Sequence, residues 1–159
     1  MAKSTWKKLD ASDKILGRLC SQIAKKVLLG EHIVITNAKN AVISGNRNTT
    51  LKKYVDLMNV RTATNPTHGP FHSSRPDTFL RQRIKLMLPN NDRGNKAYRK
   101  VHVYINDIPK SKQSKYGKPE TIEIEKASAS RLSSKFISIG DVCTHIGWSG
   151  KSRDLVEFN

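Results

Sequence analysis

The chain is poor in cysteine and in long apolar runs, and each shortage excludes a class of protein. It has two cysteines among 159 residues, Cys20 and Cys143, and neither has a Cys or His neighbour at zinc-ligand spacing. A disulfide framework is therefore not expected, which fits a reducing compartment. No apolar run approaches the roughly 20 residues of a transmembrane helix, and residues 1–4 contain no apolar segment of a signal peptide. We expect a soluble intracellular protein without a membrane partner.

Aromatic and acidic residues are also scarce. Aromatics make up 6% of the chain and form no RNP-type cluster, which argues against stacking on many single-stranded bases as the main binding mode. Lys and Arg number 29 against 13 Asp and Glu, a formal net charge of +16. Residues 1–60 and residues 61–100 each carry an excess of seven positive charges, and residues 101–159 carry an excess of two. This imbalance predicts a protein that binds a polyanion, because it exceeds what solubility alone requires.

Catalytic and cofactor motifs are absent from the sequence. No Gly-Lys-Ser/Thr follows the turn at Ser44–Arg47, and there is no G-x-G-x-x-G fingerprint. Alone, that turn is better explained by local structure than as a small phosphate-binding nest. His68 and His72 are four residues apart, but Gly69 and Pro70 between them exclude a shared helix face. We expect no enzyme activity, metal, cofactor or small-molecule substrate; an RNA-processing hydrolase using the two histidines is the alternative.

Apolar patterns in the first forty residues predict an α/β domain. A strand at Trp6–Asp10 is followed by a helix over about 15–28, whose apolar residues recur every four positions and whose cap is Ser12 or Asp13. The run Ile33–Thr36 is β-branched without alternation, which favours a strand covered on both faces of a parallel sheet. Strand, helix and strand in this order form a right-handed βαβ unit.

The remaining patterns complete this prediction. Helices are expected near 49–58, from Pro76 to about 88 and at 92–100, and strands at 41–43, 60–62, 101–105 and 121–125. The buried face of the helix that begins at Pro76 is expected to contain Leu80, Ile84, Met87 and Leu88. Residues 110–119 are expected to form a polar connector, and Ser138 is expected to begin a short helix. The result is a three-layer α/β/α fold with a mostly parallel central sheet. Residues 1–109 are expected to be an RNA-binding core, and residues 110–159 a C-terminal extension that packs on the core or on a neighbouring protein.

Residues 61–89 combine a stiff loop with a basic helix. Three prolines between residues 64 and 76 restrain the loop, because proline fixes its own φ and restricts the residue before it. Arg81, Arg83 and Lys85 then lie on the polar side of the helix, pointing outward. Rigid irregular loops beside cations suit shape recognition of a folded RNA, and no helix-turn-helix, zinc finger or basic zipper favours DNA.

Several motifs follow one another in a fixed order. They are Leu16–Leu19, Ile43–Asn46, Thr64–Pro66, Gly69–His72, Arg75–Asp77, Met87–Pro89 and Val101–Tyr104. As a set covering roughly residues 6–109, they resemble the large-subunit ribosomal protein thirteen family in its archaeal and eukaryotic form. Phe136–Trp148 resembles the C-terminal segment of the same branch, and the absence of a long basic tail makes the chain most similar to archaeal members. Gln82 and the pair Lys85-Leu86 depart from the family pattern, which commonly has Arg and Arg-Gly there.

The resemblance implies a structural constituent of the cytoplasmic large ribosomal subunit that supports subunit assembly and translation. Its implied partners are large-subunit ribosomal RNA and neighbouring large-subunit proteins, with no enzyme activity and no cofactor. An extraribosomal RNA-binding regulator remains an alternative. The residues expected to contact RNA are Arg18, Asn46, Arg47, Arg61, Thr64, Asn65, His68, His72, Arg75, Arg81, Arg83, Lys85, Arg93, Lys96, Arg99 and Lys100.

Overall fold

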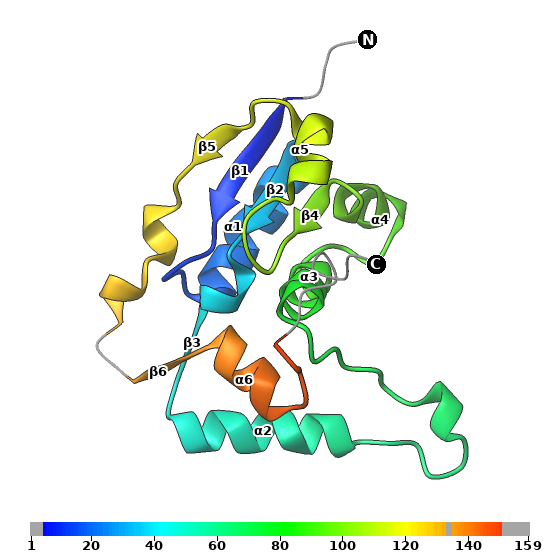
Figure 1. Cartoon of the computed structure of the whole chain (residues 1–159). Coiled ribbons are helices and arrows are strands. Elements are labelled where there is room, and N and C mark those ends of the chain that lie inside the picture. Colours follow the sequence, from blue (N-terminus) through cyan, green and yellow to red (C-terminus); the bar gives the residue numbers. More distant parts are fainter. Residues whose placement is uncertain (1–4, 133–134, 151–159) are drawn as a thin grey trace, which may run out of the picture.

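A parallel four-stranded sheet forms the centre of the protein, whose computed structural model describes residues 5–132 and 135–150. The strand order is β4–β2–β1–β5 (Figure 1). The strands are β1 (Trp6–Asp10), β2 (His32–Thr36), β4 (Val101–Val103) and β5 (Glu120–Ile122). The predicted three-layer fold with a mostly parallel sheet is confirmed, including the βαβ unit at the start of the chain.

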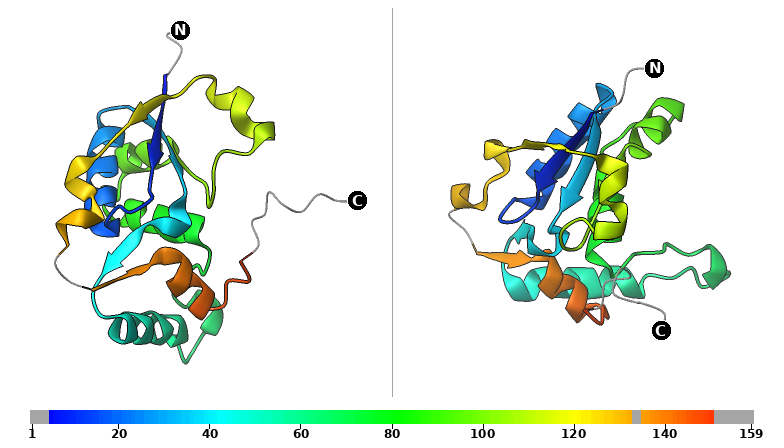
Figure 2. Two further views of the ribbon diagram at one scale, coloured as in Figure 1. Left: turned by 60° about the vertical axis from the view of Figure 1, so that its left-hand side comes forward. Right: turned by 45° about the horizontal axis from the view of Figure 1, so that its top comes forward.

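Helices cover both faces of this sheet. Both faces of β2 are therefore buried, which explains why apolar and polar residues do not alternate in its sequence. Ile33 and Ile35 belong to the cluster beneath the helices of one face, whereas Val34 belongs to a second cluster with Tyr104 and Tyr116. All three β2 side chains are completely buried. The helices of the first face are α1 (Leu16–Leu28), α3 (Pro76–Leu86) and α4 (Asp92–Tyr98), and α5 (Lys110–Tyr116) lies on the other face (Figure 2).

The first helix has the predicted apolar face but begins differently. Leu19 and Ile23 are completely buried, and Gly30 follows the helix with a φ of 104°. The predicted cap at Ser12 or Asp13 is wrong, because the N-cap is Ile15 and no side chain caps the helix. The Ile15 amide instead donates to the carbonyl of Ala127 at 2.7 Å. A long-range contact with the C-terminal part of the chain therefore replaces the local cap.

A second, two-stranded antiparallel sheet lies beside the central one. It pairs β3 (Val42–Ser44) with β6 (Phe136–Ser138), and the helices α2 (Arg47–Asn59) and α6 (Ile139–His145) pack next to it. The Ser138 hydroxyl accepts a hydrogen bond from the Asp141 amide at 3.0 Å, so the predicted helix start is confirmed. None of the helices in the described ranges has the length and apolar character that crossing a membrane requires.

Two predicted elements between α2 and α4 differ from the structure. The predicted strand at residues 60–62 is wrong, because residues 60–75 leave the body as an extended arm with a 3-10 turn at Pro66–His68 (Figure 1). Met87 is 44% exposed rather than buried. The helix α3 ends at Leu86, so Met87 is not on its buried face. Phe79, which was not predicted to be buried, lies on that face instead.

The predicted polar connector at residues 110–119 is also wrong over most of its length. Residues 110–116 form α5, and its last residue, Tyr116, is buried in the second apolar cluster. Residue Pro109 precedes the helix, and Gly117 ends it with a φ of 61°. These are ordinary start and stop signals of a helix, but only one large apolar residue marks its buried side.

Candidate nucleic-acid interface

The arm, defined as residues 60–75, is shaped by side chains that the sequence suggested as RNA contacts. The Asn65 side chain accepts a hydrogen bond from the Thr67 amide at 3.2 Å and so holds the turn at the tip. Gly69 is buried against the other limb, where an added Cβ would lie 3.3 Å from the Pro66 carbonyl oxygen and 3.6 Å from the Thr62 nitrogen. The arm therefore folds back on itself. Its exposed polar residues include Arg61, Thr64, His68 and His72.

The junction between the arm and α3 is fixed by an ion pair. The Arg75 guanidinium donates through Nε and Nη2 to the Asp77 carboxylate, at 3.1 and 2.9 Å. The Asp77 carboxylate also accepts from the Thr78 amide at 2.8 Å, in the first turn of α3. About a fifth of each charged side chain is exposed, at 22% and 23%. Arg75 is thus partly neutralised, and its clearest structural task is to orient the arm.

The three cations of α3 have unequal surroundings. The Arg81 guanidinium lies 4.5 Å from the centre of the Tyr98 ring, and the Arg83 guanidinium lies 5.2 Å from the centre of the Phe79 ring. Both arginines are half-buried, and the Arg81 Nε is buried without an acceptor. Lys85 is exposed. The Lys85 ammonium also lies 5.8 Å from the centre of the Tyr98 ring, so all three cations lie near aromatic rings and only Lys85 is exposed.

The next helix, α4, and its C-cap carry exposed cations. Asn91 caps it by accepting from the Gly94 amide at 3.0 Å. The cations Arg93, Lys96 and Arg99 are exposed. The remaining predicted contact of this region, Lys100, donates to the Gly30 carbonyl at 3.3 Å and so also ties α4 to the end of α1.

Other predicted contacts lie apart from this group. Arg47 begins α2 at the end away from the arm, and a 13-residue helix spans about 20 Å. Its guanidinium lies 3.7 Å from the Asp141 carboxylate in an exposed pair. The Asn46 side chain accepts from the Asn48 amide at 3.2 Å and caps the same helix. Arg18 is exposed in the first turn of α1.

The sequence analysis missed the lysines of α5. The Lys112 ammonium lies 5.6 Å from the centre of the Tyr104 ring. The Lys115 ammonium lies 5.9 Å from the centre of the Tyr116 ring. Arg81, His102 and Lys112 line one hollow between α3, β4 and α5. Cations from separate parts of the chain therefore converge on this side. Pro109 and Gly117, which flank the helix, were the available signals.

These positive charges act on His102, the half-buried histidine of β4. The Tyr116 hydroxyl is hydrogen-bonded to His102 Nδ1 at 2.9 Å and to the Tyr104 hydroxyl at 2.6 Å. Burial lowers the pKa of His102 to about 4, with further contributions from the charges of Lys115 and Arg81. His102 is therefore neutral at neutral pH, which fits its place in an aromatic cluster with Trp6.

The described residues contain neither a cluster of metal-ligand side chains nor a reactive thiol. Within residues 5–132 and 135–150, no three His, Cys, Asp or Glu side chains gather where they could hold a metal ion. Burial raises the pKa of the Cys20 and Cys143 thiols to about 12, so neither forms a reactive thiolate. His68 and His72 are exposed on the arm.

The sequence of the chain is similar to those of known proteins of one family. The family model described as ribosomal protein L13 matches residues 4–110. The large ribosomal subunit protein uL13 of Methanosarcina barkeri is 41% identical over 142 residues, which cover 87% of this chain and 96% of the relative. Its counterpart in Methanocaldococcus jannaschii is 35% identical, with the same coverage of both chains. The protein of that name in Caenorhabditis elegans is 34% identical over 143 residues, covering 88% of this chain and 68% of the relative.

Proposed function

Because the chain belongs to the ribosomal protein L13 family, we propose that it binds large-subunit ribosomal RNA and supports assembly of the large subunit. As a member of that family it is a structural constituent of the ribosome and not an enzyme. The RNA-binding face comprises the arm, α3 and α4. Neighbouring large-subunit proteins are its further partners.

The observation that carries this proposal is the group of exposed cations on α3 and α4 beside the arm. Lys85, Arg93, Lys96 and Arg99 are exposed on two helices joined by a short connection. Each cation placed on a phosphate releases condensed counterions, which favours binding at low salt. Arginine adds a forked donor pair that matches phosphate geometry. The net charge of +16 supplies the long-range attraction.

Within the proposed interface, side chains divide into those that contact RNA and those that shape the contact surface. Asn65, Asn46 and Arg75 hold turns and junctions through hydrogen bonds to the protein itself. Arg81 and Arg83 combine ring packing with charge. The exposed cations of α4 and the exposed residues of the arm then make most of the direct contacts.

The first experiment measures the salt dependence of binding to deproteinised large-subunit ribosomal RNA. The double variant Lys96→Gln/Arg99→Gln removes two exposed cations of α4. We expect weaker binding and a slope of log K against log salt that is smaller by about 2. The matched control, Lys126→Gln/Arg131→Gln, removes two exposed cations from the opposite side of the molecule (Figure 1). Equal slopes for the two variants would contradict the assigned face.

A second experiment locates the protein in cells. Native protein should sediment with large subunits through a high-salt cushion, and RNA crosslinks should fall within residues 61–100. A protein that stays mainly unbound would instead support an extraribosomal regulator.

The same proposal assigns different roles to two parts of the chain. In this proposal residues 1–109 form the RNA-binding core, and residues 110–159 form an extension that packs on it and adds β5 to the central sheet. The charge excess of seven within residues 61–100 and of only two within residues 101–159 supports this assignment.

A further inference from the structure

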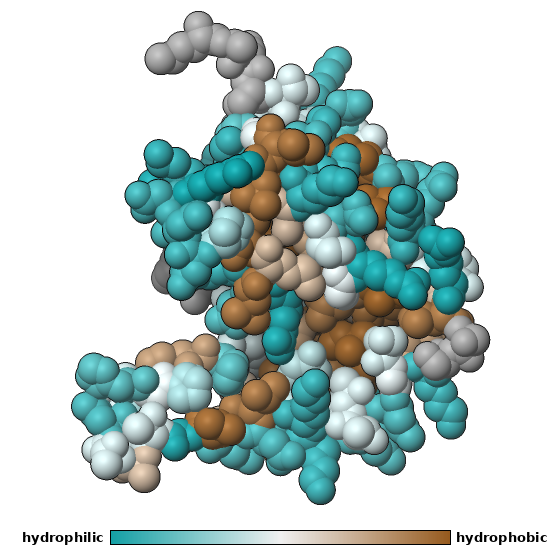
Figure 3. All heavy atoms as spheres, turned by 180° about the vertical axis from the view of Figure 1, so that it is seen from behind, coloured by the Kyte–Doolittle hydropathy of each residue, from teal (hydrophilic) through white to brown (hydrophobic). Residues whose placement is uncertain are grey.

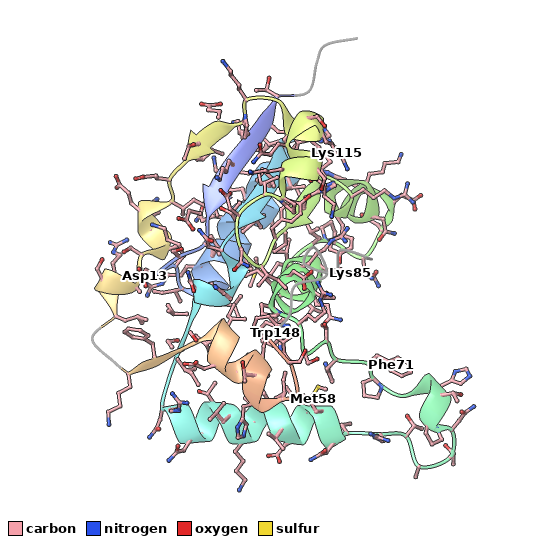
Figure 4. All side chains as sticks on the ribbon, viewed as in Figure 1. Asp13, Met58, Phe71, Lys85, Lys115 and Trp148 are labelled. Carbon is pink, nitrogen blue, oxygen red and sulfur yellow. The ribbon has the colours of Figure 1, made fainter. Side chains whose placement is uncertain are left out.

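A hollow of about 480 Å³ separates the root of the arm from α3 and α4. Its size falls within the range of about 300–1,000 Å³ for small-molecule pockets. Phe71 lines it from the arm, and Leu86, Leu88 and Pro89 line it from the end of α3 and the connection to α4. Figure 3 shows the arm standing away from the body with a recess between them, and Figure 4 shows Phe71 and Lys85 on the same side of the molecule.

The apolar side chains around this hollow are unusually open to solvent. Phe71 is 76% exposed and Leu86 75%, and both line the hollow. Met87, the residue after Leu86, is 44% exposed. The other exposed large apolar residues of the described chain are Leu29 after α1, Val60 at the start of the arm and Phe136 in β6, and none of these three lines the hollow. An aromatic ring and its apolar neighbours gathered at a recess indicate an interaction site rather than scattered surface residues.

Polar groups around the hollow indicate what binds there. The amide side chains of Gln82, Asn90 and Asn95 line it, and amides carry the donors and acceptors that pair with the edge of a nucleobase. Lys85 lines it too, and none of the acidic residues in the described part of the chain does. This combination of ring, amides and cation fits one unpaired nucleotide. It fits a basic protein tail less well, because the charge that the described residues bring to the site is positive.

We propose that this hollow takes one unpaired base of large-subunit ribosomal RNA, stacked on Phe71, with Lys85 close to the phosphate of the same nucleotide. The inference rests on the proposed RNA binding and adds a single-nucleotide site to a surface that otherwise recognises backbone and shape. Tyr98 also lines the hollow, but Phe71 is the exposed ring that the arm brings to it.

The test begins with RNA affinity at fixed salt for three variants. Phe71→Ala should bind deproteinised large-subunit RNA about 5- to 100-fold more weakly, the usual effect of losing one base–aromatic stack. Its salt slope should be unchanged, because no phosphate contact is removed. Phe71→Trp keeps a stacking ring and should retain affinity. The control Leu29→Ala removes an equally exposed apolar side chain, at 74%, and should bind as the wild type does.

Base-specific chemical probing then shows whether a nucleotide occupies the hollow. One unpaired base should be protected by the wild type and by Phe71→Trp, and should become reactive with Phe71→Ala while the backbone footprint persists. Phe71 is exposed, so the variants should fold, and circular dichroism checks this.

The outcomes separate this inference from the proposed function. If Phe71→Ala changes neither affinity nor base reactivity while Lys96→Gln/Arg99→Gln lowers the salt slope, the nucleotide site is wrong and RNA binding stands. Absence of binding by the wild type would overturn RNA binding itself. If Phe71→Ala weakens only the association with a neighbouring ribosomal protein, the hollow holds protein and the inference is overturned.

Discussion

Gly94 shows how a single position permits the connection that forms part of the hollow. An added Cβ would lie 1.8 Å from the Pro89 carbonyl oxygen and 2.9 Å from its carbonyl carbon. These are backbone atoms, so they cannot turn aside as a flexible side chain would. The tight passage from α3 into α4 therefore requires a residue without a side chain at position 94.

Replacing Gly94 by alanine should destabilise the protein by roughly 1–3 kcal/mol or more, because the new methyl group overpacks the connection. Urea unfolding at neutral pH measures the change. Gly17 provides the matched control: it lies in α1 with nothing within 4 Å of an added Cβ. Gly17→Ala should raise stability by up to about 1 kcal/mol through helix propensity. A Gly94→Ala protein as stable as the wild type would show that the connection relaxes freely.

His102 makes stability depend on pH. Its pKa is about 4 in the folded protein, lowered chiefly by burial, and returns to about 6.5 on unfolding. The unfolded state therefore binds the proton more readily between these values. The stability contributed by neutral His102 is complete above pH 6.5 and is lost as the pH falls toward 4. The urea midpoint should fall over this window.

The variant His102→Gln isolates this effect, because glutamine does not titrate. Its urea midpoint should fall less between pH 6.5 and pH 4.5 than that of the wild type. The pKa of His32 is also lowered by burial, but His32 is present in both proteins, so its contribution cancels in the comparison. Identical pH profiles would mean that His102 does not titrate in this range.

At the scale of elements, α3 carries cations with two different tasks. Arg83 packs on the rings of Phe79 and Tyr54, at 5.2 and 5.6 Å from their centres. Lys85, two residues along, is exposed at the hollow. One cation joins α3 to α2, and the other faces the proposed RNA.

Replacing Arg83 and Lys85 by alanine, one at a time, should distinguish the packing role from the RNA-binding role. Arg83→Ala should lower the free energy of unfolding by about 0.5–1 kcal/mol, since it removes a cation–ring contact. Lys85→Ala should change it by less than about 0.5 kcal/mol, yet should reduce the salt slope of RNA binding by about 1. Thermal unfolding and filter binding measure the two quantities. Equal effects of both changes on stability would contradict the assignment.

Elements with strong apolar periodicity were predictable, and those that depend on distant contacts were not. The buried strand β2 and the apolar face of α1 follow from local sequence. The start of α1 does not, because Ile15 bonds to Ala127 more than a hundred residues away. Helix α5 was missed because only Tyr116 marks its buried side. Strand β6 has three residues, too few to show a period.

The candidate site was predictable in its charge but not in its shape. Composition and the charge excess of residues 61–100 pointed to the arm, α3 and α4. The ring packing of Arg81 depends on where α4 places Tyr98, which no local pattern contains. In the sequence, nothing distinguishes Phe71 from an apolar residue of the core. Its exposure follows only from the arm leaving the body, so the hollow became visible with the structure.

At the scale of the whole molecule, the late part of the chain shares the core of the early part. Ile124 and Ile139 are buried in the same cluster as the apolar face of α1. Tyr116 occupies the second cluster with Val34. The apolar interior thus joins residues from both ends of the described chain.

This shared core predicts a large effect at a position outside the RNA-binding region. Ile139→Ala should destabilise the protein by about 2–5 kcal/mol, because Ile139 is completely buried. Phe136→Ala, in the neighbouring strand, removes a side chain that is 53% exposed and should have a much smaller effect. Urea unfolding of both variants measures the difference. A small loss for Ile139→Ala would indicate that residues 136–145 pack only loosely on the core.

The position of β1 has a consequence for synthesis of the chain. β1 lies between β2 and β5, and Lys7 is paired with Glu120 in the register of the outer pair. Translation begins at the N-terminus, so β2 is available early, whereas residues 120–122 emerge last among the strands of this sheet. Until then one edge of β1 stays open to pairing with other chains. Charged side chains on an open edge strand discourage such pairing, so we expect Lys7 and Lys8 to protect the unfinished protein.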